Sequence, residues 1–395
     1  MHRNSVSRGA ALLAAAGVLA ATLTGCGSDG DAAGAGAVEE PNGALAIVVG
    51  AHANTPPPAL TGTAARARDL AVSQGSAFSL VVADGAPFVA ESGPLRVTGD
   101  TAEEQQQERA DNRQRVDDAV ASARAQTPET DLLSALRVAA ESIQDIPGPH
   151  SIVVVDSGLS TAGALDFRNP DVLDAVPSEL ADALGLKNQL PPVTGMTVDF
   201  VGLGNTAATQ EPLDAIRRVQ LQGIWKTVTE TAGASRVEVE SAPEGDPPAA
   251  DLPPVTPISV PLGYSCVGDV MTITGGRLAY WPYTSSFMDP ALAESILRPI
   301  GAQVRDRMLT VLFEGTAADV RDTSEQLMLS YLQPQAIADM WLEKEDVPIQ
   351  LLTVVGLGSD FEGRRPEADA TGAFDPIAAE ANRKITMTFS EPITC

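Results

Sequence analysis

The chain has 395 residues, of which 44% are hydrophobic and 20% charged, a composition typical of a folded globular protein rather than a disordered one. Its 52 acidic and 26 basic side chains give a net charge of −26. This balance argues against nucleic acid or an anionic membrane surface as a partner, because both require a basic protein face. The length allows two or three domains.

The first 26 residues have the layout of an export signal. Arg3 and Arg8 precede an apolar run over 9–23 that is short for a spanning helix, and small residues lead to Cys26. The "LTGC" that ends at Cys26 resembles the lipobox of bacterial lipoproteins. The resemblance implies removal of residues 1–25, a diacylglyceryl group on Cys26, and an extracytoplasmic protein held at the membrane by lipid. The alternative is an ordinary secretory signal that leaves Cys26 free or paired.

Two stretches of biased composition divide the rest of the chain. Residues 26–43 are rich in Gly, Ala and acidic side chains, which predicts a flexible tether. Residues 241–257 are acidic and rich in Pro, which predicts an extended, semi-rigid linker. We therefore expect one domain over 44–240 and a second over 258–395.

Short apolar runs alternate with helical patterns in the first domain. The runs expected to form buried strands are 44–50, 78–84, 151–156 and 196–202. Leu132, Leu136, Ala139 and Ile143 recur at helical spacing after Thr130, a candidate N-cap. This alternation predicts a doubly wound parallel sheet of the α/β class, in which ligands bind at the carboxyl ends of the strands.

The first domain resembles the von Willebrand factor A (VWA) family in "ETDLLSALRVAAESI", "HSIVVVDSGLSTAG" and "MTVDFVGLG". The resemblance implies a divalent cation, commonly Mg²⁺, at the carboxyl edge of the sheet. Hard oxygen donors suit that ion. Matched by position, Thr130 takes the place of the family's Thr ligand and Asp156 the place of the Asp that follows the central strand.

The first part of that metal motif is altered. Where the family has Asp-x-Ser-x-Ser, the chain reads "GAHAN", so that Gly50 replaces the Asp and His52 and Asn54 replace the two Ser residues. His52 suits zinc better than magnesium. One possibility is that His52 and Asn54 complete a substitute cation site with Thr130 and Asp156. The alternative is that Asp156 accepts backbone N–H groups of its own loop.

No catalytic residue is predicted. His52 beside Ser157 or Ser160 would suggest a hydrolase, but "GLSTAG" differs from the G-x-S-x-G nucleophile turn. We therefore expect a binding protein without a cofactor, apart from the candidate divalent cation.

The second domain reads strand, helix, strand, helix and two closing strands, which predicts an α+β layer. The stretches "LFEGTAAD", "LSYLQPQAIADMWL", "LLTVVGLGSDF" and "NRKITMTF" resemble the OmpA-like, peptidoglycan-associated family. The resemblance implies a site for the diaminopimelate of the wall peptide. In that site a carboxylate pairs with the ligand's ammonium, and an Arg binds its carboxylate.

Three positions carry this candidate peptidoglycan site. The family's Asp falls on Ala318 or, with a shift of one residue, on Asp319; Gln333 stands where the helix Arg belongs; and Arg383 matches the closing Arg. Pro334 is expected to interrupt the start of that helix. Because Gln333 has no charge, the alternative is a fold retained for protein contacts.

Two cysteines remain if Cys26 carries lipid. Cys266 and Cys395 would form a disulfide in an oxidising compartment, and the alternative is two buried thiols. Together these features predict a non-enzymatic, membrane-anchored scaffold of the cell envelope with peptidoglycan as a candidate partner. The alternatives are a protein-interaction subunit of an envelope or secretion complex and a metal-dependent adhesion module.

Overall fold

A computed structural model describes residues 41–53, 55–241 and 252–395 of the chain. The expected signal, the lipidation site Cys26, most of the tether and the candidate ligand Asn54 lie outside the described residues. Within these ranges no helix is long and apolar enough to cross a membrane.

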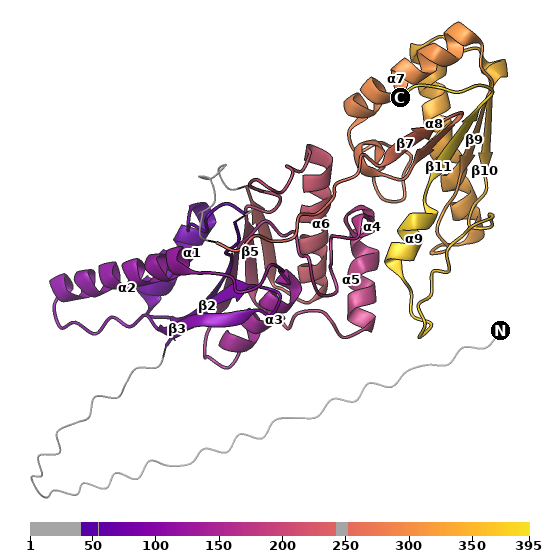
Figure 1. Cartoon of the computed structure of the whole chain (residues 1–395). Helices are drawn as coiled ribbons and strands as arrows, with labels where there is room; N and C mark the ends of the chain where they lie inside the picture. The colour runs from indigo at the N-terminus through magenta and orange to yellow at the C-terminus, as the bar shows by residue number, and fades with distance from the viewer. Residues whose placement is uncertain (1–40, 54, 242–251) are drawn as a thin grey trace, which may run out of the picture. The chain divides into compact units, whose positions relative to one another are not determined.

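The first sheet has six strands in the order β3-β2-β1-β4-β5-β6 (Figure 1). The strands are β1 (Ala44–Gly50), β2 (Ala77–Ala83), β3 (Phe88–Pro94), β4 (His150–Val155), β5 (Thr197–Val201) and β6 (Arg236–Glu240). All neighbours run parallel except β2 and β3, which are antiparallel. The sequence analysis did not predict β3, because its residues alternate between half-buried and exposed rather than forming an apolar run.

The central strand β1 explains why continuous apolar runs form this sheet. Alternate residues of a strand point to opposite faces. Ala44, Ala46 and Val48 therefore enter one core with helices α3 to α6, whereas Leu45, Ile47 and Val49 enter a second core with α1 and α2. The helices are α1 (Gly62–Gln74), α2 (Ala102–Ser122), α3 (Leu132–Ile143), α4 (Pro170–Asp174), α5 (Pro177–Leu186) and α6 (Ala215–Thr231).

The expected N-cap Thr130 is wrong by one residue. Asp131 precedes α3, and its side chain accepts the N–H of Ser134 at 3.0 Å. A carboxylate at this position also lies favourably at the positive end of the helix dipole. The Thr130 side chain therefore does not cap α3.

The second sheet has five strands in the order β10-β9-β11-β8-β7. They are β7 (Tyr264–Val267), β8 (Val270–Ile273), β9 (Val311–Gly315), β10 (Leu352–Gly356) and β11 (Ile385–Phe389). Only β9 and β10 are parallel, so the sheet is mixed. The predicted mixture of α/β and α+β architecture is confirmed in this coarse sense, whereas the VWA assignment of the first sheet stays a prediction.

Helices α7 (Pro290–Arg307) and α8 (Thr323–Lys344) pack on the second sheet, where Trp341 of α8 and Phe313 of β9 belong to the core. The short elements are η1 (Gly276–Leu278), η2 (Ile349–Leu351) and α9 (Pro376–Asn382). The expectation that Pro334 interrupts the start of a helix is wrong, because α8 begins eleven residues earlier and continues through it. Pro334 has no N–H group to donate to the Ser330 carbonyl, four residues earlier in the helix. That carbonyl faces Gly315 of β9, and a Cβ at Gly315 would lie only 1.9 Å from the carbonyl oxygen.

Residues 252–262 join the two sheets without helix or strand. Leu252, Val255 and Ile258 are 5–6% exposed, and Ile258 belongs to the core of the first sheet. The part of the Pro-rich segment that the structure describes is thus extended and packed. We refer below to residues 41–262 as the six-stranded half and to 263–395 as the five-stranded half.

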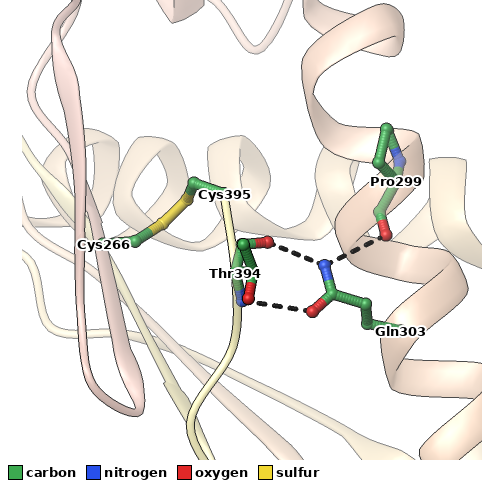
Figure 2. Close-up of a disulfide and its surroundings, with 5 residues drawn as sticks. All are labelled: Cys266, Pro299, Gln303, Thr394 and Cys395. Atoms are coloured by element: carbon green, nitrogen blue, oxygen red, sulfur yellow. Dashed lines mark hydrogen bonds between the residues drawn. A yellow bond between two sulfur atoms is a disulfide. The ribbon is translucent and has the colours of Figure 1, made fainter.

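The C-terminal tail is fastened to the five-stranded half (Figure 2). Cys395 is bonded to Cys266 of β7, as predicted, with a Cα–Cα distance of 6.1 Å. Gln303 of α7 holds the preceding residue, because its side chain donates to the Thr394 carbonyl at 2.7 Å and accepts the Thr394 N–H at 3.1 Å. The disulfide closes a loop between Cys266 and Cys395 that contains most of the five-stranded half.

Candidate functional site

Asp156 lies at the carboxyl end of β4 and is 7% exposed. Its Oδ1 accepts the N–H of Gly158 at 2.6 Å. Burial raises the pKa of its carboxyl group, although the Gly158 N–H and the nearby His52 act in the opposite direction. The carboxyl group lies directly over Gly50 at the end of β1, where a Cβ would be only 1.8 Å from Oδ2. The Asp156 carboxyl group can therefore occupy this position only because residue 50 has no side chain.

Thr130 is brought against the loop that follows Asp156. Its N–H donates to the Thr161 side chain at 3.0 Å, and its carbonyl accepts the Thr161 N–H at 2.8 Å. The Thr130 hydroxyl is buried and has no hydrogen-bond partner within the described ranges. Thr130 and Asp156 thus lie on adjoining segments, and the hydroxyl oxygen of Thr130 has no hydrogen-bond partner among the described residues.

His52 does not complete a metal shell with them. Its side chain is 1% exposed, and its Nε2 lies 3.0 Å from the Thr127 carbonyl, to which it must donate. No group of three or more His, Cys, Asp or Glu side chains suited to a metal occurs in the described part of the chain. One buried carboxyl and one hydroxyl do not fit a divalent cation. The described residues alone therefore do not favour a cation at this edge, and the expected site, which includes Asn54 outside the described residues, stays a prediction.

A cavity of about 130 Å³ opens beside Asp156. It lies at the carboxyl ends of β1, β4 and β5, where parallel sheets bind ligands. Its lining is largely apolar and includes Pro56, Pro57, Val155 and Val201, with Asn205 as a polar group.

The second candidate site lies in the five-stranded half. Gln333 and Arg383 both line a small cavity of about 50 Å³, together with Tyr283 and Ala318. Asp319 adjoins it, because the residues on either side of Asp319 line the cavity. Two of the three candidate positions therefore line one cavity and the third adjoins it, and their role in binding a ligand stays a prediction.

The Asp319 carboxylate is already bound by the chain. Its Oδ1 accepts from the Gln326 side chain at 2.8 Å and its Oδ2 from Arg364 at 3.3 Å. Its backbone N–H donates to Glu367 at 2.7 Å. Gln333 is likewise engaged, because its side chain donates to the Thr284 carbonyl at 2.9 Å.

Arg383, at the end of α9, is held by two carboxylates. Its Nη1 donates to Glu380 at 2.9 Å and its Nη2 to Glu179 of α5 at 2.5 Å. Burial alone lowers the pKa of the guanidinium, but the two carboxylates outweigh it and raise that pKa. Tyr283 joins the group, because its hydroxyl donates to the same Glu179 oxygen at 2.7 Å.

Burial and neighbouring charges in this cluster also raise the pKa values of Glu380 and Tyr283. Burial raises the pKa of Glu380 to about 7; Arg383 opposes this shift, and the nearby Asp174 and Glu179 add to it. Burial and the bond to Glu179 raise the pKa of Tyr283 to about 12. At neutral pH the cluster therefore combines the fixed positive charge of Arg383 with the Glu380 carboxyl group, whose pKa lies close to that pH.

A larger cavity of about 210 Å³ lies beside Arg383 and Glu380, between the two halves. Val176, Pro177, Val219 and Gly223 line it from the six-stranded half. The five-stranded half contributes Tyr280, Trp281, Tyr283 and Met288. Trp281 is 46% exposed, so an aromatic ring reaches solvent beside this cavity.

Sequence reasoning missed Glu179, Glu380 and Tyr283. Glu380 lies three residues before Arg383, a spacing that brings side chains together on a helix and that could have drawn attention to it. Glu179 is 204 residues from Arg383, and nothing in its sequence surroundings distinguishes it from other acidic residues at the start of a helix.

Comparison with known proteins gives partial likenesses. No protein family matches the sequence, and no curated protein matches it. The periplasmic domain of Helicobacter pylori MotB is 9% identical, with a TM-score of 0.26 over 33% of this chain and 88% of that one. The peptidoglycan-associated lipoprotein from Burkholderia pseudomallei is 15% identical, with a TM-score of 0.22 over 27% and 83%.

The cell wall anchor of the T6SS from Pseudomonas aeruginosa is also similar. It is 23% identical, with a TM-score of 0.25 over 32% of this chain and 86% of that one. These solved structures resemble about a third of the chain.

Proposed function

We propose that the chain is a lipid-anchored, non-enzymatic binding protein of the cell envelope whose five-stranded half contacts peptidoglycan. The observation that carries this proposal is that Gln333 and Arg383 line one small cavity and that Asp319 adjoins it. A carboxylate and a guanidinium at one place suit a ligand that carries both an ammonium and a carboxylate, such as the diaminopimelate of a wall peptide.

The wall contact is tested by retention on purified diaminopimelate-type sacculi. We expect the full chain to be retained, and Arg383→Gln and Asp319→Asn to lower the retained fraction at least about five-fold. Arg236→Gln, at a half-exposed side chain of β6, is the matched control and should be retained like the natural chain. Absence of retention, while a known OmpA-like domain is retained, would overturn the wall contact.

The lipid anchor is tested separately. Cells fed an alkyne-labelled fatty acid should label the natural chain, and Cys26→Ser should abolish that label. A label that survives the substitution would remove the anchor from the proposal.

One observation favours the alternative of a protein-interaction subunit. Four large apolar side chains of α8 are 38–52% exposed, namely Leu327, Met328, Tyr331 and Leu332. Exposed apolar clusters often mark protein contacts. A photo-crosslinking residue at Tyr331, compared with one at the exposed Leu186 of α5, should form a discrete adduct in envelopes only from α8.

A further inference from the structure

We propose that Glu179 is a built-in occupant of the Arg383 site, which keeps a carboxylate-bearing ligand out until α5 moves away from the five-stranded half. This inference rests on the proposed function and adds regulation to the same site. Helix α9, which ends at Asn382 just before Arg383, contacts α4 and α5. Glu179 is the group of the six-stranded half that meets the guanidinium.

The first reason is that each terminal nitrogen of Arg383 already donates to a carboxylate of the chain. A carboxylate is bound best when two nitrogens of the guanidinium fork donate to it. Both terminal nitrogens of Arg383 are used, one by Glu380 and one by Glu179. Glu380 is in the same helix and stays beside Arg383 whatever the six-stranded half does. Glu179 is therefore the partner that can leave.

The second reason is that Glu179 is bound incompletely. Its Oε1 accepts both hydrogen bonds, from Arg383 and from Tyr283. Its Oε2 is buried and has no partner among the residues that the structure describes. A buried oxygen without a partner costs about 1–3 kcal/mol. A ligand carboxylate that satisfies both of its oxygens would consequently compete well with Glu179.

The third reason is that the other ion pairs beside this one are weak. Lys187 pairs with Asp369 at 3.1 Å and Arg365 with Asp171 at 3.6 Å, with all four side chains 26–63% exposed. Exposed pairs of this kind contribute about 0–1 kcal/mol. Ile377 of α9 also packs against the core of the six-stranded half, and the Gly276 N–H donates to Asp174 at 3.2 Å. The adjoining cavity of about 210 Å³ leaves part of this contact unfilled, and a contact that is only partly apolar permits relative motion.

The space beside Arg383 on the side of Gln333 is small. The cavity that these two residues line measures about 50 Å³, compared with about 210 Å³ for the cavity that Arg383 and Glu380 line. Departure of Glu179 would free one terminal nitrogen of the guanidinium for a ligand that enters the smaller cavity.

The test uses Glu179→Gln in the full chain, with Glu179→Lys as a stronger variant because a positive charge repels Arg383. Lys187→Gln is the matched control, since it removes an exposed pair of the same contact and leaves the partners of Arg383 in place. Two readouts are taken: modification of Arg383 by phenylglyoxal, followed by mass spectrometry, and retention on diaminopimelate-type sacculi.

We expect both Glu179 variants to raise the rate of Arg383 modification and the retained fraction, each about five-fold or more, and Lys187→Gln to change neither. Equal modification of Arg383 in the natural chain and both variants overturns the masking, even if all are retained on sacculi. Faster modification without retention supports the masking and counts against the wall contact, so the two proposals fail separately.

Discussion

Arg383 and Glu179 are 204 residues apart in the sequence, and the Nη2 of one donates to the Oε1 of the other at 2.5 Å. Their side chains are 20% and 8% exposed, so both charges are largely removed from water. A charge at such a depth depends on its partner, because an unpaired buried ion is far more costly than a paired one. The position of α5 therefore determines whether Glu179 occupies Arg383 in the predicted wall site.

This coupling is measurable as a double-mutant cycle. Glu179→Gln and Arg383→Gln should each lower the free energy of unfolding by about 1–3 kcal/mol, and the double variant should lose less than the sum. Urea unfolding of the four proteins gives the coupling energy. Strictly additive losses would mean that the two side chains stabilise the fold independently of each other.

Glu380 should give the protein a pH-dependent stability. Burial raises its pKa in the folded protein to about 7, whereas a Glu in an unfolded chain titrates near about 4.3. The folded state therefore binds the proton more tightly. The stabilisation is complete below the unfolded pKa and is lost as the pH rises through the folded one.

From this group we expect the free energy of unfolding to fall by about 2 kcal/mol between about pH 5 and pH 8. Glu380→Gln cannot lose a proton and should flatten that part of the slope. Glu391→Gln, at a side chain 62% exposed, is the matched control. Urea unfolding at four pH values checks this, and an unchanged slope in Glu380→Gln would contradict it.

Position 50 should tolerate a side chain only if Asp156 is shortened. A Cβ at Gly50 would lie 1.8 Å from Asp156 Oδ2, so Gly50→Ala should cost about 1–3 kcal/mol by overpacking. In an Asp156→Ala background the same change should cost much less. Gly185→Ala is the control, because its Cβ would meet nothing closer than 3.4 Å within helix α5 and should be neutral or stabilising.

Added metal should leave the stability of the natural chain unchanged. Gly50 contributes no ligand, and the Nε2 of His52 is committed to the Thr127 carbonyl. Ligands that bind the folded state raise its melting temperature, so we expect Mg²⁺ or Zn²⁺ at millimolar concentration to shift Tm by less than about 1 °C. A saturable rise that EDTA reverses would establish a cation site and contradict this expectation.

The disulfide should stabilise the five-stranded half. Its cysteines are 129 residues apart, and closing a loop of that size is typically worth about 2–4 kcal/mol. Cys266→Ser with Cys395→Ser should therefore lower the free energy of unfolding by that amount, and reductant should have the same effect on the natural chain. Gln303→Ala removes the hydrogen bonds to Thr394 but keeps the bridge, and should cost about 1 kcal/mol or less.

The sequence predicted most of the regular structure because local patterns determine it. A strand buried on both faces must be apolar at every position, and 44–50 matches β1 residue for residue. The edge strand β3 escaped prediction because its exposed positions carry no such pattern. The effect of Pro334 was predicted wrongly because α8 continues through it, and the Ser330 carbonyl that it leaves without a helical hydrogen bond lies against Gly315 of β9, which has no side chain in the way.

The candidate sites likewise contain some residues that local sequence indicated and others that it did not. The sequence by itself identified Asp156, Asp319, Gln333, Arg383 and the two cysteines as residues of interest, because each lies in a recognisable local motif or is one of few of its kind. Which charges meet is a matter of through-space distance. Only the tertiary structure placed Asp156 over Gly50 and Glu179 on Arg383, since residues far apart in the chain become neighbours through packing that no local pattern encodes.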